Sequence, residues 1–168
     1  LAKVDAEEIR AHLATPRPDR IDWIRTAMLA GMTTEDVNDY TNIDPWFLDQ
    51  LGELIVHEKA IKERAAKGLA AFDREFMRET KALGFSDRQL ARALGVSEWD
   101  VRGHRKSIGV LPNYKLVDTC AAEFESYTPY YYSTYEDGED EFRPIVDAES
   151  GAKKEHVIVL GGGPNRIG

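Results

Sequence analysis

The sequence predicts a mainly α-helical protein in which a small helical domain precedes an irregular segment and one β-strand. Three observations predict this class. Apolar residues recur with helical spacing from about residue 19 to residue 110, caps and glycine stops lie at the ends of these stretches, and one helix-turn-helix pattern occurs twice. After residue 110 the helical period is lost. The short β-branched run "HVIVL" (156–160) then predicts a strand buried on both faces.

The composition bounds the size and class of the protein. Its 168 residues, 42% apolar and 31% charged, suffice for one domain and the edge of a second. The sequence shows no apolar run near the roughly 20 residues of a membrane span and no secretory signal. Cys120 is the single cysteine, so a reducing, cytoplasmic location is expected. The net charge of −8 argues against a general nucleic-acid binder, whose affinity rests on neutralising phosphates.

The first predicted helix begins near Asp19, which can cap it after Pro16 and Pro18 interrupt the preceding chain. Its apolar face comprises Ile21, Ile24 and Met28. Gly31 stands where a glycine would end the helix.

The clearest helix begins at Asp44, a predicted N-cap followed by Pro45 in the first helical position, and ends at Gly68. Its predicted apolar stripe comprises Phe47, Leu51, Leu54, Ile55, Ile61 and Ala65. Its predicted solvated face comprises Glu53, Glu58, Lys59, Lys62, Glu63 and Arg64. A further helix around Phe72, Phe76 and Leu83 is expected to stop at Gly84.

An internal repeat links residues 31–46 to residues 84–99, which align without a gap. The matched pairs are Gly31 with Gly84, Thr33 with Ser86, Val37 with Leu90, Ile43 with Val96, and Trp46 with Trp99. Each copy predicts a hydroxyl cap, a short helix, a turn and a second capped helix. We expect both tryptophans to be buried, so that replacing either with Ala costs roughly 3–5 kcal/mol.

The second copy also allows a different function. Residues 86–106 have the pattern of a DNA-reading helix-turn-helix, in which Arg102, His104, Arg105 and Lys106 would contact DNA. The acidic chain and the first copy, whose second helix opens "DPWFLDQ", favour helical packing instead.

Tyrosines are concentrated after residue 110, at 114, 127, 130, 131, 132 and 135. Stacking on single-stranded nucleic acid would require basic neighbours, whereas the neighbours here include Glu123, Glu125, Glu136 and Asp137. An interface between domains is therefore the favoured interpretation.

The C-terminal stretch "VIVLGGGPNRIG" places a glycine-rich loop directly after the predicted strand. Arg166 occupies the slot where a dinucleotide fingerprint has its third glycine, and no lysine follows Lys154 to complete a phosphate-binding loop. Asn165 and Arg166 could contact an anion, and a nucleotide-binding role for 157–168 stays open. A tight strand-to-helix turn is the favoured interpretation.

No catalytic or metal-binding group emerges from the sequence. The histidines at 12, 57, 104 and 156 have no ligand spacing among themselves or with Cys120, and no nucleophile motif is present.

Three stretches together closely resemble the large subunit of carbamoyl phosphate synthetase: "NIDPWFLDQL" (42–51), "YKLVDTCAAEFESYTPYYYSTYE" (114–136) and "VIVLGGGPNRIG" (157–168). The resemblance runs from about "RPDRIDWI" (17–24) to the last residue, and "GFSDRQLARALGVSEWDVR" (84–102) matches the family's helical oligomerisation domain.

The resemblance implies a domain plan. Residues 1–18 would be the tail of the first synthetase half, 19–110 the oligomerisation domain, 111–151 a connecting strap and 152–168 the start of the second half. Leu1 in place of a starting Met and the abrupt end in a glycine loop fit a piece of a longer chain. Such a piece is expected to be inactive and to need no cofactor. The parent enzyme would use ATP with Mg or Mn to make carbamoyl phosphate from bicarbonate and ammonia.

The resemblance also implies partners and site residues. It implies self-association through the helical domain. It also implies contact with the rest of the large subunit and with a glutamine amidotransferase small subunit. Binding to nucleic acid or to a membrane is not expected. Residues shaping the interior near the carbamate passage would be Gly161, Gly162, Gly163, Asn165, Arg166 and Gly168. Residues packing between domains would be Tyr114, Asp118, Thr119, Cys120, Tyr130, Tyr132 and Tyr135.

Overall fold

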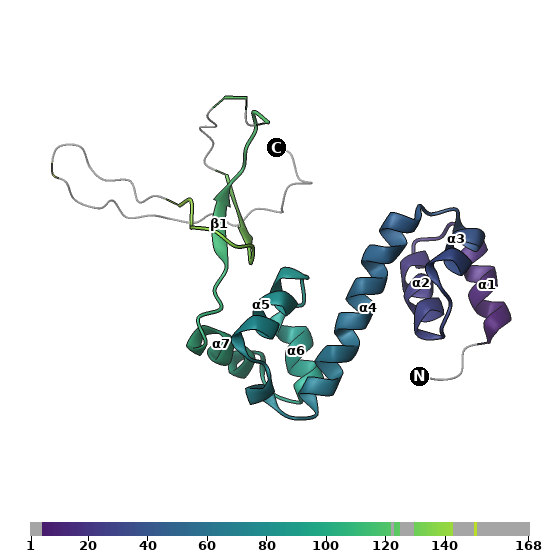
Figure 1. Cartoon of the computed structure of the whole chain (residues 1–168), viewed down its shortest axis with the longest axis horizontal. Coiled ribbons are helices and arrows are strands. Elements are labelled where there is room, and N and C mark those ends of the chain that lie inside the picture. Colours follow the sequence, from purple (N-terminus) through teal and green to yellow (C-terminus); the bar gives the residue numbers. More distant parts are fainter. Residues whose placement is uncertain (1–4, 122, 125–129, 143–149, 151–168) are drawn as a thin grey trace. The chain divides into compact units, whose positions relative to one another are not determined.

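The computed structural model describes residues 5–121, 123, 124, 130–142 and 150. The chain divides into two units, Leu1–Leu111 and Pro112–Gly168, each of which is described by itself. In the described residues the first unit contains seven α-helices and a 3-10 helix, and the second contains a two-stranded sheet (Figure 1). The predicted mainly helical class is confirmed. The predicted strand at 156–160 lies outside the described residues.

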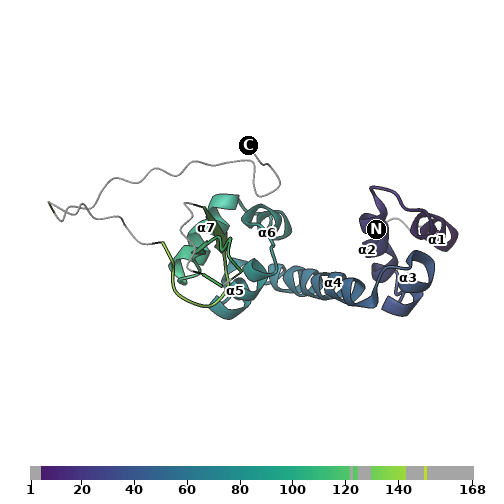
Figure 2. The same ribbon diagram turned by 90° about the horizontal axis from the view of Figure 1, so that it is seen from above.

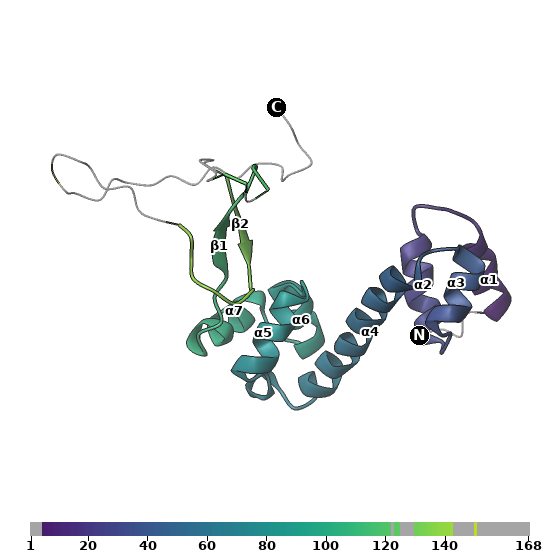
Figure 3. The same ribbon diagram turned by 45° about the horizontal axis from the view of Figure 1, so that its top comes forward.

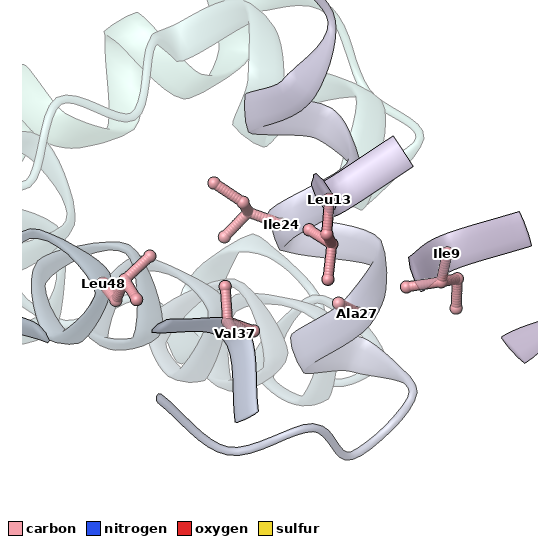
Figure 4. Packing of buried hydrophobic residues seen from close by; sticks show 6 residues of the cluster. All are labelled: Ile9, Leu13, Ile24, Ala27, Val37 and Leu48. Atoms are coloured by element: carbon pink, nitrogen blue, oxygen red, sulfur yellow. The ribbon is translucent and has the colours of Figure 1, made fainter. Parts of the chain in front are cut away.

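The first three helices form a core with the start of the fourth. They are α1 (Ala6–Ala14), α2 (Arg20–Leu29) and α3 (Thr34–Thr41), followed by α4 (Pro45–Ala65). The core cluster comprises Ile9, Leu13, Ile24, Ala27, Val37 and Leu48 (Figure 4). Full burial of an aliphatic side chain of this size stabilises the fold by about 1.5–3 kcal/mol. The predicted boundary after residue 18 falls between α1 and α2, which share this core.

Arg20 joins the three helices by satisfying carbonyl groups at two helix ends. Its Nε donates to the Leu13 carbonyl at 2.8 Å, and its Nη2 donates to the Thr41 carbonyl at 3.1 Å. The last carbonyls of a helix have no partner within the helix, so this side chain completes the hydrogen bonding of α1 and α3.

The face of α2 differs in part from the prediction. Ile24 is buried as expected, but Ile21 is 57% exposed. Asp19 precedes the helix without making a side-chain cap, because its Oδ2 instead accepts a hydrogen bond from Trp23 Nε1 at 3.2 Å.

Helix α4 is 21 residues long and continuous (Figure 2). The Asp44 side chain caps it by accepting from the Trp46 amide at 2.9 Å, and Pro45 opens it, as predicted. Its buried side chains are Leu48, His57 and Ile61, whereas Phe47 is 59% exposed. The predicted stripe is therefore wrong at its first residue, because the turn after α3 directs Leu48 rather than Phe47 into the core.

A second helical group packs at the C-terminal half of α4 (Figure 3). It comprises η1 (Leu69–Ala71), α5 (Arg74–Ala82), α6 (Asp87–Leu94) and α7 (Glu98–Ser107). The buried apolar residues of this group are Phe72, Phe76, Met77, Leu90, Ala91, Val101 and Val110. The glycine stops predicted at 68 and 84 follow α4 and α5.

A buried ion cluster joins the helices of this second group. Asp87 at the start of α6 lies 2.9 Å from Lys81 Nζ of α5 and accepts from Arg105 Nε of α7 at 2.8 Å. Burial opposes ionisation of Asp87, but hydrogen bonds and charge from Lys81 and Arg105 outweigh it and lower the pKa of Asp87. Removing one member of such a cluster leaves an uncompensated buried charge, which is strongly destabilising.

The structure confirms the repeat in detail. Thr33 and Ser86 each form a capping box, α3 and α6 have the same length, and Asn42 and Gly95 follow them in the left-handed conformation with φ of 55° and 69°. Val37 and Leu90 are fully buried.

The expected burial of the two matched tryptophans is wrong. Trp46 is 62% exposed and Trp99 is 75% exposed. Each lies in the first turn of the second helix of its repeat, next to the cap. At this position the side chain points away from the core that the preceding helix covers. The alignment was therefore right, but an apolar residue in an equivalent position does not have to be a core residue.

The second unit contains a β-hairpin that the sequence did not predict. Strands β1 (Asn113–Leu116) and β2 (Tyr131–Thr134) pair antiparallel, with Tyr114 opposite Ser133 and Leu116 opposite Tyr131. The Val117 amide continues the ladder by donating to the Tyr130 carbonyl at 2.9 Å.

Candidate functional site

A groove with a volume of about 800 Å³ lies beside the middle of α4 in the first unit. Its floor is formed by Leu51, Leu54, Ile55 and Ile61 of α4. The remaining lining residues come from α2, in the helical group at the N-terminal half of α4, and from α6 and the α5–α6 turn, in the group at its C-terminal half (Figure 2). These apolar wall residues are Ile21, Leu83, Phe85 and Ala93. The sequence placed Leu51, Leu54 and Ile55 in a core stripe, whereas the structure leaves them half-buried on the groove floor.

A charged network crosses one wall of the groove. Both side-chain oxygens of Glu58 contact Arg25 of α2, at 2.7 Å to Nη2, and Lys62 Nζ lies 2.7 Å from Oε1. Burial opposes ionisation of Glu58, but hydrogen bonds from Arg25 and Lys62 outweigh it and lower its pKa. Glu58 was predicted to lie on a solvated face, but it connects α2 to α4. This ion pair therefore fixes the α2 part of the groove lining to α4.

Two further charges border the groove at opposite walls. Asp22 lies on α2 and Arg92 lies on α6, and both are exposed. Neither side chain makes an ion pair within the described part of the chain.

His57 occupies a buried position on another side of α4. Its ring stacks on Phe76 at a centroid distance of 4.9 Å and lies 5.7 Å from Phe85. Nε2 is 2.7 Å from the fully buried Thr80 hydroxyl, and Nδ1 is 3.7 Å from Glu79. Burial lowers the pKa of His57, and the Glu79 carboxylate partly offsets this effect. A buried, neutral, hydrogen-bonded histidine of this kind joins α4 to α5 and serves the packing of the two helices.

Exposed aromatic residues lie at the equivalent helix starts of the two repeats. Trp46 and Phe47 form an edge-to-face pair at 4.9 Å, and the Arg102 guanidinium lies 5.8 Å from the Trp99 ring centroid. Large exposed aromatic side chains are common at protein interfaces.

The predicted interdomain residues in the second unit are largely exposed. Tyr114, Tyr130 and Tyr132 are 41%, 65% and 49% exposed. Hairpin pairing brings Tyr114 and Tyr132 onto adjacent strands, with Tyr130 directly before β2 and Tyr135 directly after it. These tyrosines offer aromatic surface, and their packing between domains stays a prediction.

The three polar residues predicted with these tyrosines lie in one turn. Asp118 Oδ1 accepts from the Cys120 amide at 2.8 Å, and the Thr119 hydroxyl is 3.8 Å from Cys120 Sγ. The structure thus brings Asp118, Thr119 and Cys120 together locally.

The predicted passage residues Gly161, Gly162, Gly163, Asn165, Arg166 and Gly168 lie outside the described residues.

The DNA-binding alternative gains no support from the geometry. The α6–α7 unit exists, but two of its four candidate contact residues serve the fold. Arg105 belongs to the buried ion cluster, and His104 Nε2 lies 2.7 Å from the Phe72 carbonyl.

Metal-binding clusters and membrane-spanning helices are absent from the described residues. Across residues 5–121 and the described parts of the second unit, no three His, Cys, Asp or Glu side chains lie close enough to hold a metal ion. The helices described here include none that is long and apolar enough to cross a membrane.

Comparison with known proteins gives a consistent result. Residues 2–109 match the family described as "Carbamoyl-phosphate synthetase large chain, oligomerisation domain". The carbamoyl phosphate synthase large chain of Nostoc sp. is 52% identical over 162 residues, covering 96% of this chain and 14% of the relative. That of Synechocystis sp. is 50% identical over 160 residues, covering 95% and 14%.

A third relative gives a similar match. The large chain of Thermus thermophilus is 46% identical over 168 residues, covering all of this chain and 15% of the relative. The chain thus spans about one seventh of the length of these relatives. The match covers every helix of the first unit, so the chain belongs to the family of the carbamoyl-phosphate synthetase large-chain oligomerisation domain.

Proposed function

We propose that this chain is a non-catalytic connecting and self-association module of a carbamoyl phosphate synthase large chain. The observation that carries the proposal is the match of residues 2–109 to an oligomerisation domain. The structure supports it with a helical unit whose surface presents an apolar groove and exposed tryptophans.

The synthase would make carbamoyl phosphate from bicarbonate, ammonia released from glutamine, and two ATP. We propose a glutamine amidotransferase small subunit and the rest of the large chain as further partners of that enzyme. ATP with Mg or Mn would supply the phosphoryl chemistry. Because the described residues form no metal-ligand cluster, we assign no step of that chemistry to them.

Self-association can be tested on the 168-residue chain by light scattering over a hundredfold range of concentration. A mass that rises to twice the monomer value supports the module. A monomer across the whole range would exclude self-association through this chain alone. Hydrolysis of ATP by the chain at a meaningful rate would contradict its non-catalytic role.

A further inference from the structure

The groove beside α4 lies between two helical groups of opposite charge. Residues 5–44 carry nine acidic and four basic side chains, whereas residues 66–111 carry six acidic and nine basic ones. The net charges are therefore −5 and +3, counting histidine as neutral. The negative group packs at the N-terminal half of α4 and the positive group at its C-terminal half (Figure 2).

The floor of the groove is centred on the helix. Its α4 residues run from Leu51 to Lys62, and the helix itself runs from Pro45 to Ala65. They recur at spacings of three and four residues, so they form one stripe along the helix. A stripe of this kind can pack against another helix, and a symmetric copy of the same stripe is an equally suitable partner.

We propose that a second copy of this chain covers the groove, with the two α4 helices antiparallel about a two-fold axis. This rests on the proposed self-association and assigns it to one surface. In a two-fold contact the same patch is used on both copies, so the patch must be complementary to itself. The antiparallel arrangement meets this condition because the acidic group of each copy faces the basic group of the other.

One pair of groove residues makes the arrangement specific. Asp22 lies on the α2 wall and Arg92 on the α6 wall, and both are exposed. In the antiparallel pair, the α2 wall of one copy faces the α6 wall of its partner. Asp22 therefore meets Arg92 across the axis, and the pair occurs twice. A parallel arrangement would instead place like charges together, which disfavours association.

Charge reversal tests this without disturbing the core. We expect Asp22→Arg and Arg92→Asp each to raise the dimer dissociation constant about tenfold or more, because each places like charges opposite one another twice. The double variant Asp22→Arg with Arg92→Asp restores both pairs and should return the constant to within about threefold of the wild type. Dissociation constants would be measured by sedimentation equilibrium on the 168-residue chain.

Matched controls exist on the same helical groups. Asp39→Arg and Arg88→Asp make the same changes of net charge at exposed residues that do not line the groove. Both should leave the dissociation constant nearly unchanged. Circular dichroism and thermal unfolding establish that each variant keeps the fold.

The outcomes separate this inference from the proposed function. A wild-type chain that stays monomeric overturns the proposed self-association itself. A wild-type dimer whose groove reversals behave like the controls overturns the groove interface and leaves self-association standing. The Trp46→Ala or Trp99→Ala variant could also abolish the dimer while the charge reversals leave it intact. That result would likewise overturn the groove interface, because it would place the contact on the exposed aromatic side chains.

Discussion

At the scale of single residues, His57 shows how burial sets the charge state of a side chain. The ring is 7% exposed and lies against Phe76, with Thr80 as its hydrogen-bond partner. Burial disfavours the imidazolium and lowers the pKa of His57 below its usual value. The neutral ring is therefore the form that the α4–α5 contact requires.

Because the folded protein holds His57 in its neutral form, the free energy of unfolding depends on pH. The pKa of His57 is about 6.5 in the unfolded chain and lower in the folded chain. As the pH is lowered, the unfolded chain therefore binds a proton at His57 at a higher pH than the folded chain does. The contribution of neutral His57 is present in full above that pH and is lost as the pH falls through the folded-state pKa. We expect the Tm to fall between pH 8 and pH 5, and to fall less steeply in His57→Gln. His12→Gln, which changes a half-exposed histidine, serves as the control, and equal slopes in all three proteins would contradict the prediction.

The exposed tryptophans lead to the opposite expectation for stability. Trp46 and Trp99 bury too little surface for their removal to open a cavity. Replacing either with Ala should cost less than about 1 kcal/mol of unfolding free energy. Leu90→Ala, at a fully buried position of the repeat, should cost about 2–5 kcal/mol. Urea unfolding of the three variants measures the difference, and a cost above about 3 kcal/mol for a tryptophan variant would show that its ring is buried.

At the scale of elements, the two repeats form a natural pair of controls for helix termination. Asn42 and Gly95 occupy the same left-handed position after α3 and α6. A β-carbon added at Gly95 meets nothing within 4 Å, so the strain of a substitution there is conformational alone.

A swap at this position should therefore show a graded effect. We expect Gly95→Ala to cost about 1 kcal/mol and Gly95→Asn to cost less, because Asn tolerates the left-handed region better. Asn42→Gly should be neutral or slightly stabilising. Thermal and urea unfolding measure these changes. A cost of Gly95→Asn equal to or above that of Gly95→Ala would contradict the view that tolerance of the left-handed conformation decides this position.

Helix ends could be predicted from the sequence better than helix faces. Asp44 with Pro45, Thr33, Ser86 and the glycine stops each act through local hydrogen bonds or backbone angles, and all lie where expected. The rotation of α4 depends instead on how it meets α2 and α6, which are distant in sequence. For this reason Phe47 was placed in the core and Glu58 in solvent. The groove could not be predicted for the same reason.

At the scale of the whole molecule, the two units differ in how they are stabilised. The helical unit has buried cores and a buried ion cluster. The hairpin of the second unit has two strands of four residues each, and none of these eight residues is buried. A two-stranded sheet of this size is only marginally stable without further packing.

Hydrogen exchange should reveal the difference. We expect amides of residues 113–116 and 131–134 to exchange much faster than those of Leu48, Leu90 and Val101, which lie in the helical cores. Mass spectrometry of the exchanging chain at neutral pH provides the measurement. Protection of the hairpin equal to that of the helical cores would show that it packs on another surface.

The pattern of packing within the helical unit has a consequence for biosynthesis. Each helix mostly contacts the helices next to it in the chain: α1 packs on α2 and α3, α3 on α4, and α6 on α7. Contacts of this kind close short loops, and proteins rich in them fold in microseconds to milliseconds. A ribosome adds only about 5–20 residues per second. The core shared by α1, α2, α3 and the start of α4 can therefore begin to form once Leu48 has left the exit tunnel, without waiting for α7 to emerge.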